Sequence, residues 1–261
     1  MTPAPEVHRG ERIAKVIARA GLCSRREAER WIATGRVAVD GKVLTSPAIN
    51  VTQASAITID GQILPAPSAP RLFRFHKPPG VLTTAHDPQG RPTIYDNLPK
   101  DLPRVMPVGR LDFNSEGLLL LTNDGGLKRY MELPSTGWIR RYRARAFGVP
   151  DPDALARLAG GATIEGIDYG PIEVTLDRRP ATAHGRNLWL TVALAEGKNR
   201  EVRRALAHLG LQVNRLIRIA YGPFQLGDLA RSAGEEIPAK VLREQLGAAF
   251  PRATPRRAAR G

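Results

Sequence analysis

The first part of the chain carries apolar residues at helical spacing. A helix is predicted over residues 11–20, where the apolar positions fall on one side: Ile13, Val16, Ile17 and Ala20. Ser24 followed by Glu27 is a capping box, which predicts that a second helix begins there, with Ala28, Trp31 and Ile32 facing inward. The second helix is expected to stop near Gly35.

Two Asp-Gly pairs then mark short hairpins. Asp40-Gly41 lies between the runs 36–39 and 42–44, and Asp60-Gly61 lies between the runs 56–59 and 62–64. Asp-Gly between alternating apolar residues is a strong hairpin signal. A proline-rich stretch follows, and prolines at that density favour an extended, semi-rigid linker. We expect a small domain over residues 8–66 and a linker over 67–70.

From residue 71 onward, strand-like and helix-like patterns alternate. Strands are predicted where apolar runs are short or alternate with polar residues: 71–76, 118–121, 139–147, 172–176, 188–194 and 213–220. Helices are predicted over 127–133, 151–159, the segment ending at Gly210, and 237–246. The mixed order favours an α+β domain over residues 71–250 with a mixed, mainly antiparallel sheet. The basic tail 251–261 is expected to be disordered.

The run Leu118–Leu121 is predicted to be an interior strand, because it is short and has turn signals at both ends. Just before it, a polar loop between Gly109 and Gly117 carries four polar side chains: Arg110, Asp112, Ser115 and Glu116. Side chains on a loop next to a rigid strand can be held in place for chemistry. The alternative is that Asp112 is only a turn or cap residue.

Charge adds a class of partner. The formal net charge is +14, and phosphate backbones are the usual partner of so basic a surface. No apolar stretch reaches membrane-spanning length, and no basic amphipathic helix has the face of Trp, Phe and Leu that favours a membrane surface. A single cysteine, Cys23, and no Cys/His cluster indicate a cytoplasmic protein without a metal site.

Basic residues gather on the first two predicted helices. These helices, together with the segments Ser24-Arg-Arg-Glu-Ala-Glu29, Ile32 and Gly35-Arg-Val-Ala-Val-Asp-Gly41, resemble the RNA-binding domain of ribosomal small-subunit protein four. The resemblance implies these RNA-binding residues: Arg12, Lys15, Arg19, Ser24, Arg25, Arg26, Arg30 and Arg36. The alternative is a solvated charged face.

Most of the chain, from the small domain to about Leu246, resembles the RsuA/RluB family of ribosomal RNA pseudouridine synthases. The motifs that carry this resemblance are Lys77-Pro-Pro-Gly80, Gly109-Arg-Leu-Asp112, Ser115-Glu-Gly-Leu-Leu119, Thr122-Asn-Asp-Gly125, Tyr142 and Gly197-Lys-Asn-Arg-Glu-Val-Arg-Arg204. Gly109 precedes Arg110 as in this family, whereas related large-subunit enzymes tend to have histidine at that position. The run Asn199-Arg-Glu-Val-Arg-Arg204 is more like the large-subunit, RluB-like branch. One departure is Arg140, where the family often has lysine.

The resemblance implies that a uridine is converted to its C5-linked isomer without a cofactor. Asp112 would be the catalytic carboxylate, acting as a nucleophile or as a base at the sugar. A nearby cation would favour its ionised form. Arg203 is the first choice for that cation, and Arg204 is the second.

The resemblance also implies contacts to the substrate. Tyr142 would stack on the target base, and its hydroxyl could serve as a catalytic group in a later proton transfer at C5. The alternative is a core tyrosine, which is the commoner fate on an alternating strand. Arg110 would fill the space of the flipped-out uridine or hold a phosphate. Lys77, Lys198 and Arg200, with Arg204, would contact the RNA backbone. Glu116 is interpreted as a residue that fixes the loop, and Asp124 as a turn residue.

Ribosomal RNA is the expected partner, in particular 23S RNA or a pre-ribosomal particle, and the protein is expected to be a monomer. A non-catalytic RNA-binding or ribosome-assembly protein is the alternative. It would explain the charge and the small domain equally well, but it gives no reason for the glycine-framed Asp112 and its matching motifs.

Overall fold

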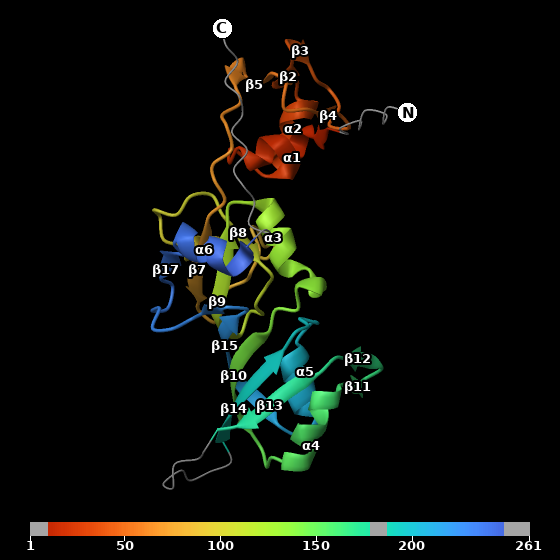
Figure 1. Cartoon of the computed structure of the whole chain (residues 1–261), viewed down its shortest axis with the longest axis vertical. Coiled ribbons are helices and arrows are strands. Elements are labelled where there is room, and N and C mark those ends of the chain that lie inside the picture. The colour runs from red at the N-terminus through yellow and green to blue at the C-terminus, as the bar shows by residue number, and fades with distance from the viewer. Residues whose placement is uncertain (1–9, 178–186, 248–261) are drawn as a thin grey trace. The chain divides into compact units, whose positions relative to one another are not determined.

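A computed structural model describes residues 10–177 and 187–247, and the chain divides into two compact units (Figure 1). The boundary between the units falls between Pro70 and Arg71, directly after the predicted linker. The basic tail 251–261 and residues 8 and 9 of the predicted small domain lie outside the described residues. Each unit has a hydrophobic core of its own.

Unit 1 pairs two short helices with small antiparallel strands. Its elements are β1 (Glu11–Arg12), α1 (Ile13–Arg19), α2 (Arg25–Ala33), β2 (Val37–Val39), β3 (Lys42–Val43), β4 (Asn50–Val51), β5 (Ile57–Ile59) and β6 (Gln62–Ile63). A four-stranded sheet has the order β3-β2-β5-β6, and β1 pairs with β4. The two predicted helices and both predicted hairpins are confirmed.

Local sequence signals explain these elements. The Ser24 hydroxyl accepts a hydrogen bond from the Glu27 backbone N–H at 3.1 Å, so it caps α2. Asp40 and Asp60 have φ values of +51° and +49°, as a tight Asp-Gly hairpin turn requires. Ile13, Ile17, Ala28 and Ile32 are fully buried in one core between the helices and the sheet.

Unit 2 is built on a nine-stranded sheet. Its strands are β7 (Leu72–Lys77), β8 (Met106–Val108), β9 (Ser115–Thr122), β10 (Arg140–Phe147), β13 (Ile172–Leu176), β14 (Asn187–Leu194), β15 (Gln212–Tyr221), β16 (Phe224–Gln225) and β17 (Gly234–Glu236). The main order is β13-β14-β10-β15-β9-β7-β17, with β8 on β9 and β16 on β15. Of the described pairs, β15 with β9 is parallel and the others are antiparallel. The predicted mixed, mainly antiparallel α+β fold is confirmed.

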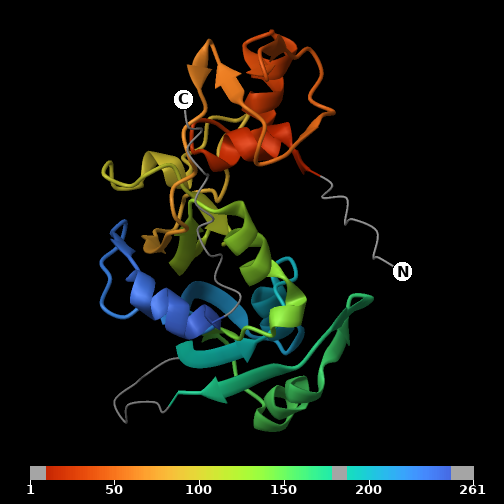
Figure 2. The same cartoon turned by 45° about the horizontal axis from the view of Figure 1, so that its top comes forward.

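Helices accompany both parts of this sheet (Figures 1 and 2). They are α3 (Gly125–Glu132), α4 (Pro152–Arg157), α5 (Glu201–His208) and α6 (Ala239–Leu246), with the 3-10 helices η1 (Ile94–Asp96), η2 (Pro134–Thr136) and η3 (Leu158–Gly160). A small hairpin, β11 (Ala162–Ile164) with β12 (Ile167–Tyr169), lies beside α5. Over the described ranges, none of these helices is long and apolar enough to cross a membrane.

The central strand β9 separates two cores. Leu119 and Leu121 belong to one core, which also receives α4 and α5 residues, and Leu118 and Leu120 belong to the other, which receives α3 and α6 residues. Alternation along a strand sends neighbouring side chains to opposite faces, so β9 is buried on both. The interior strand predicted from the leucine run is confirmed.

The predicted boundary between the loop and β9 was wrong. β9 begins at Ser115, so Ser115 and Glu116 are buried strand residues and not loop residues. Gly117 has a φ of +104°, and a Cβ there would lie 2.4 Å from the Arg218 carbonyl oxygen. This close approach of β9 and β15 admits only glycine. The strand pairing, which spacing does not reveal, extends β9 beyond its apolar run.

Candidate active site

Asp112 lies on the loop between β8 and β9, which we call the Asp112 loop (residues 109–114). Gly109 begins the loop with a φ of +67°, in the left-handed region that glycine adopts without strain. The Asp112 carbonyl accepts a hydrogen bond from the Ser115 N–H at 3.0 Å, which closes the loop onto β9. The Asp112 side chain is 31% exposed, so a ligand can reach its carboxylate.

Lys77 fixes the backbone of the Asp112 loop. Its amine, at the end of β7, is fully buried and donates to the carbonyl oxygens of Asp112 at 3.2 Å and Ser115 at 2.9 Å, and also to those of Pro78 and Phe113. Burial lowers the pKa of Lys77 to about 8, although the charge of Asp112 raises it. Lys77 was predicted to contact a phosphate, whereas the structure encloses its amine among four carbonyl oxygens.

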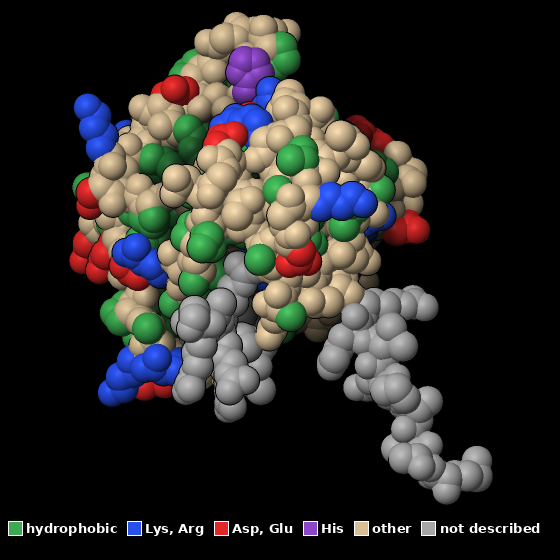
Figure 3. All heavy atoms as spheres, turned by 90° about the horizontal axis from the view of Figure 1, so that it is seen from above, with side chains coloured by type: hydrophobic (Ala, Val, Ile, Leu, Met, Phe, Trp, Pro, Cys, Tyr) green, Lys and Arg blue, Asp and Glu red, His purple; other side chains and the backbone are tan. Residues whose placement is uncertain are grey.

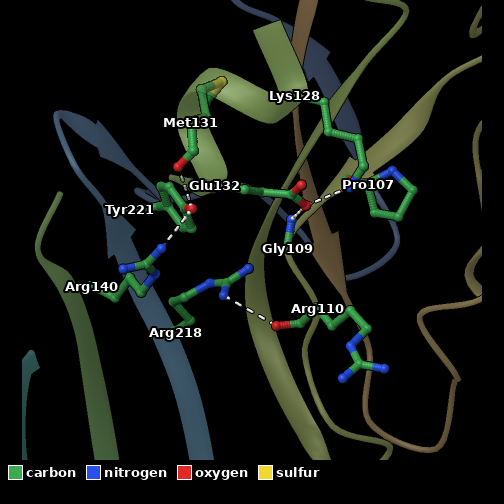
Figure 4. Close-up of polar contacts among 9 residues, drawn as sticks. All are labelled: Pro107, Gly109, Arg110, Lys128, Met131, Glu132, Arg140, Arg218 and Tyr221. Carbon is green, nitrogen blue, oxygen red and sulfur yellow. Dashed lines mark hydrogen bonds and ion pairs between the residues drawn. The ribbon is translucent and has the colours of Figure 1, made fainter. Parts of the chain in front are cut away.

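The other end of the loop is tied to α3 (Figure 4). The Gly109 N–H donates to Glu132 Oε1 at 2.6 Å, and the same carboxylate pairs with Lys128. Lys128 also donates to the Pro107 carbonyl oxygen at 2.7 Å. Asp124, predicted to be a turn residue, caps α3 by accepting from the Leu127 N–H. Helix α3 is therefore joined by polar contacts to the start of the loop, at Gly109, and to the preceding strand β8, at Pro107.

Arg218 of β15 supports the middle of the loop. Its guanidinium is almost fully buried and donates to the carbonyl oxygens of Leu118 at 2.7 Å and Arg110 at 3.4 Å. The Arg110 side chain itself is exposed and points away from Arg218 (Figure 4). Sequence reasoning assigned no role to Arg218. The sequence does contain a clue: Arg218 lies two residues after the buried Leu216 on the same strand, so both side chains point to the same, inward face.

Arg140 extends this buried network. Its guanidinium donates to the Tyr221 hydroxyl at 2.9 Å, and the Tyr221 hydroxyl donates to the Met131 carbonyl oxygen at 2.9 Å (Figure 4). The guanidinium also donates to the carbonyl oxygens of Trp138 and Ala195. Arg140 is therefore a structural link between β10, β15 and α3.

The cation closest to the Asp112 carboxylate is Arg200. Its Nη1 lies 3.9 Å from Asp112 Oδ2, and its side chain is 50% exposed. Arg200 directly precedes α5 and has a φ of +52°, which is uncommon for a residue with a side chain and is often seen at functional sites. Arg200 was predicted to contact phosphate, and the structure places it beside the carboxylate.

The prediction that Arg203 forms the ion pair with Asp112 differs from the structure. Arg203 donates to the carbonyl oxygens of Val213 at 2.9 Å and Asn114 at 3.2 Å, so it ties the Asp112 loop to β15. Burial and the charge of Arg200 lower the pKa of Arg203, while the charge of Asp112 raises it. Arg203 thus interacts electrostatically with Asp112 but makes no direct ion pair with its carboxylate among the described residues.

The other two predicted cations face the hairpin of β11 and β12. Lys198 pairs with Glu196 at 2.8 Å and donates to the Asp168 carbonyl oxygen. Interaction with the nearby Tyr169 raises the pKa of Arg204. Arg204, the second choice as partner of Asp112, therefore has a different partner. Arg200, Arg203 and Arg204 line one pocket of about 310 Å³.

Tyr142 is 9% exposed and lies in the same core as Leu111, the residue before Asp112. Ala144 and Ala146 follow it on the same face of β10. Tyr142 is therefore a core residue at the edge of the site, and its contact with a base stays a prediction. Glu116 does not provide a second catalytic acid, because its buried carboxylate pairs with Arg215 and Arg231.

In unit 1 the predicted RNA-binding side chains differ in how free they are. Lys15 and Arg19 pair with Glu11, Arg30 with Glu27 and Arg36 with Asp60, while the Ser24 hydroxyl caps α2. Arg12, Arg25 and Arg26 are exposed, and no ion pair of theirs is found within residues 10–177 and 187–247. On the face drawn in Figure 3, Lys and Arg side chains stand apart, and some lie beside Asp or Glu.

The residues described include no cluster of three or more His, Cys, Asp and Glu side chains placed to hold a metal ion. The chemistry that the site offers is that of one accessible carboxylate with a guanidinium next to it. The loop backbone around this carboxylate is bonded to β7, β15 and α3.

Comparison with known proteins gives a consistent family. Residues 71–208 match the family described as RNA pseudouridylate synthase, and residues 11–57 match the S4 domain. An uncharacterised RNA pseudouridine synthase of Rickettsia prowazekii is 44% identical over 235 residues, which are 90% of this chain and 97% of that protein.

Two further relatives carry a more specific name. Ribosomal large subunit pseudouridine synthase B of Yersinia pestis is 43% identical over 83% of this chain and 69% of that protein. The protein of the same name from Haemophilus influenzae is 42% identical over 91% of this chain and 68% of that protein. A crystal structure of a pseudouridylate synthase shares the fold, with a TM-score of 0.62, 24% identity, and coverage of 91% of this chain and 100% of that one.

Proposed function

The chain belongs to the RNA pseudouridylate synthase family and carries an S4 domain, and from this premise we propose that it isomerises a uridine of 23S ribosomal RNA with Asp112 as the catalytic carboxylate. The enzyme class, an RNA pseudouridine synthase, follows from the family. The choice of 23S RNA is supported by the two relatives named ribosomal large subunit pseudouridine synthase B.

The observation that carries the role of Asp112 is its setting. A partly exposed carboxylate stands 3.9 Å from a guanidinium nitrogen, on a backbone bonded at both ends of the loop. The reaction breaks the bond between the base nitrogen and the sugar, forms a bond from carbon to the sugar, and moves the carbon's proton to nitrogen. Atoms and electrons balance without a cofactor, so a nucleophile or a base at the sugar suffices.

Reaching the sugar of a paired or stacked uridine requires flipping the nucleotide out. Unstacking a base costs about a few kcal/mol, which contacts in the complex must offset. Arg110 can provide such a contact, because its side chain is exposed while its backbone carbonyl is held by Arg218. Tyr142 borders the core at Leu111 and is the proposed stacking partner of the flipped base.

The roles of the cations follow the distances. Arg200 would stabilise the ionised Asp112 and the charge that develops beside it, since it is the cation in reach of the carboxylate. Arg203 would keep the loop in place through the Asn114 carbonyl oxygen. Lys198 and Arg204 are proposed to contact the RNA backbone from the side of the β11–β12 hairpin.

The test is isomerisation of unmodified 16S and 23S transcripts, mapped by carbodiimide modification and primer extension. We expect one new pseudouridine in 23S RNA, and no product with Asp112→Asn. Asp101→Asn, a change at an exposed aspartate outside the site, is the matched control. Full activity of Asp112→Asn would remove Asp112 from its role, and a product confined to 16S RNA would overturn the choice of substrate.

Inactivity on both transcripts would direct the same assay to pre-ribosomal particles. Failure there as well would favour the alternative of a non-catalytic assembly protein. Size-exclusion chromatography with light scattering tests the proposed monomer. A dimer mass would contradict it.

A further inference from the structure

A basic pocket lies on the face of the sheet opposite the core that contains Tyr142. It has a volume of about 450 Å³, and its lining includes Pro79, Asn114, Glu116, Arg145, Arg215 and Arg231. Arg145 alternates along β10 with Ala144 and Ala146, which are buried in that core, so its side chain points to the other face. Arg145 is also paired in register with Arg215 of β15. We call this the Arg145 pocket.

Glu116 organises the Arg145 pocket. Its carboxylate is 4% exposed and pairs with Arg215 at 2.5 Å and with Arg231 at 2.7 Å. Burial raises the pKa of Glu116, but the hydrogen bonds and charges of the two arginines outweigh burial and hold the pKa below its usual value. Glu116 therefore stays ionised at neutral pH and fixes two arginines that remain 43% and 56% exposed.

The charges in the pocket do not cancel. Three arginines and one carboxylate line the pocket. Two of the arginines pair with Glu116, while Arg145 is exposed and makes no ion pair within the described parts of the chain. A pre-positioned, half-exposed guanidinium is suited to a phosphate, because its donors form a planar fork that matches two phosphate oxygens. The net charge of the pocket favours an anion.

The pocket borders the Asp112 loop. Asn114 lines it and lies two residues after Asp112, so their Cα atoms are at most about 7 Å apart. The neighbouring Gly80 N–H donates to the Phe113 carbonyl oxygen at 2.8 Å. On its other side, the Asn114 carbonyl oxygen accepts from Arg203 of α5. One short segment thus separates the carboxylate from the pocket.

We propose that the Arg145 pocket binds a backbone phosphate of the substrate RNA strand close to the target uridine. The proposal rests on the proposed function, since that places the uridine at Asp112. A phosphate held on this face would anchor the strand where it leaves the active site, and it would position the sugar of the flipped nucleotide. The site would act through binding and not through chemistry.

Arg145→Ala tests the anchor without unpairing a buried charge. Arg141→Ala is the matched control, because Arg141 is exposed, lies on the same strand and face, and does not line the pocket. For filter binding of the full chain to an unmodified 23S transcript, we expect Arg145→Ala to raise Kd about tenfold. The slope of log K against log salt should fall by about 0.7–0.9, the value of one phosphate contact. Arg141→Ala should change Kd less than about twofold.

Glu116→Gln supplies a test with the opposite sign. Glutamine keeps an acceptor oxygen for Arg215 but removes the negative charge, so the pocket becomes more positive. We expect Kd to fall several-fold and the salt dependence to steepen. A purely structural role for this cluster predicts unchanged or weaker binding, and thermal melting identifies a variant that does not fold.

The proposal is overturned if Arg145→Ala and Arg141→Ala change Kd and the salt slope equally. It is also overturned if a folded Glu116→Gln variant binds more weakly than the wild type. Single-turnover isomerisation of the same transcript separates this failure from failure of the proposed function. If the wild type is active and the two arginine variants do not differ, only the proposal for the pocket is rejected. If the wild type forms no product, the result counts against the 23S substrate, and the binding comparison alone decides the proposal for the pocket.

Discussion

Individual buried side chains fix the backbone of the Asp112 loop through hydrogen bonds to its carbonyl oxygens. Lys77 is the clearest case, because a fully buried amine is tolerated only where carbonyl oxygens surround it. In an exposed turn, the amine of a lysine would be hydrated by water and would not fix neighbouring backbone. Arg218 is a second buried cation that donates to the loop backbone, at the Arg110 carbonyl oxygen.

The buried amine makes stability depend on pH in a defined direction. The pKa of Lys77 is about 8 in the folded protein and 10.5 for an ordinary lysine, so between these values the unfolded chain binds more protons. Stability therefore rises with pH across this window by up to about 1.4 kcal/mol per pH unit, and below pH 8 the contribution is constant. Lys77→Met lacks this term.

We expect the unfolding free energy of the wild type, minus that of Lys77→Met, to increase from pH 8 to pH 10.5. Urea denaturation at several pH values measures it. Lys42→Met, at an exposed position of β3, is the control and should show no such trend. A constant difference across the window would mean that the amine titrates normally.

The two arginines near Asp112 should fail in different ways. Arg203→Ala removes two hydrogen bonds to carbonyl oxygens from a half-buried guanidinium, so we expect a loss of about 1–3 kcal/mol in stability together with lower activity. Arg200→Ala removes an exposed charge beside Asp112, so we expect a lower single-turnover rate with less than about 0.5 kcal/mol lost.

Thermal melting and single-turnover isomerisation of both variants provide the measurement. A stable Arg203→Ala variant, or an Arg200→Ala variant with a normal rate, would contradict this division of roles.

At the scale of elements, α3 acts as a support for the loop. Its last residue, Glu132, accepts from the Gly109 N–H, although a helix C-terminus disfavours negative charge. Lys128, one turn earlier, compensates that charge and also reaches the Pro107 carbonyl oxygen. The helix thereby sets where the loop leaves β8.

Glu132→Ala should release the start of the loop. We expect kcat to fall about tenfold with KM little changed, because small misplacements of a catalytic group lower the rate strongly. Glu132→Gln keeps an acceptor oxygen and should recover part of kcat, which a loss of folding would not allow. Equal kcat values for Glu132→Ala and wild type would show that the β8 end of the loop needs no support.

At the scale of the whole molecule, charge is shared between two units. The net charge of +14 includes many arginines that are already paired within the chain, such as Arg36 with Asp60. Arg25 and Arg26 of α2 are exposed and unpaired among the residues described, so they are the better candidates for phosphate contacts.

The double variant Arg25→Ala/Arg26→Ala should bind 23S RNA more weakly, with the slope of log K against log salt reduced by about 1.4–1.8 for two lost contacts. Arg30→Ala/Arg36→Ala, which removes arginines with internal partners, should reduce the slope less. Filter binding at several KCl concentrations measures both. Identical slopes for the two double variants would mean that internal pairing does not select the RNA contacts.

Local signals in the sequence determined most of the elements. Ser24 begins α2, the Asp-Gly pairs close the hairpins, and the alternation at Tyr142 reports which face of β10 is buried. Each signal works within a few residues, since capping, turn geometry and alternation are properties of neighbouring backbone. Asp112 could be singled out because its motif is contiguous.

Only the tertiary structure decided what surrounds Asp112. The contacts that hold its loop join residues 35 positions apart for Lys77 with Asp112, and 108 apart for Arg218 with Arg110. Spacing along the chain does not report such distances, so Lys77 was expected at a phosphate and Arg203 in the ion pair that Arg200 makes. Burial and strand pairing assign these roles, because the charge of a side chain is known from sequence while its partner depends on the fold.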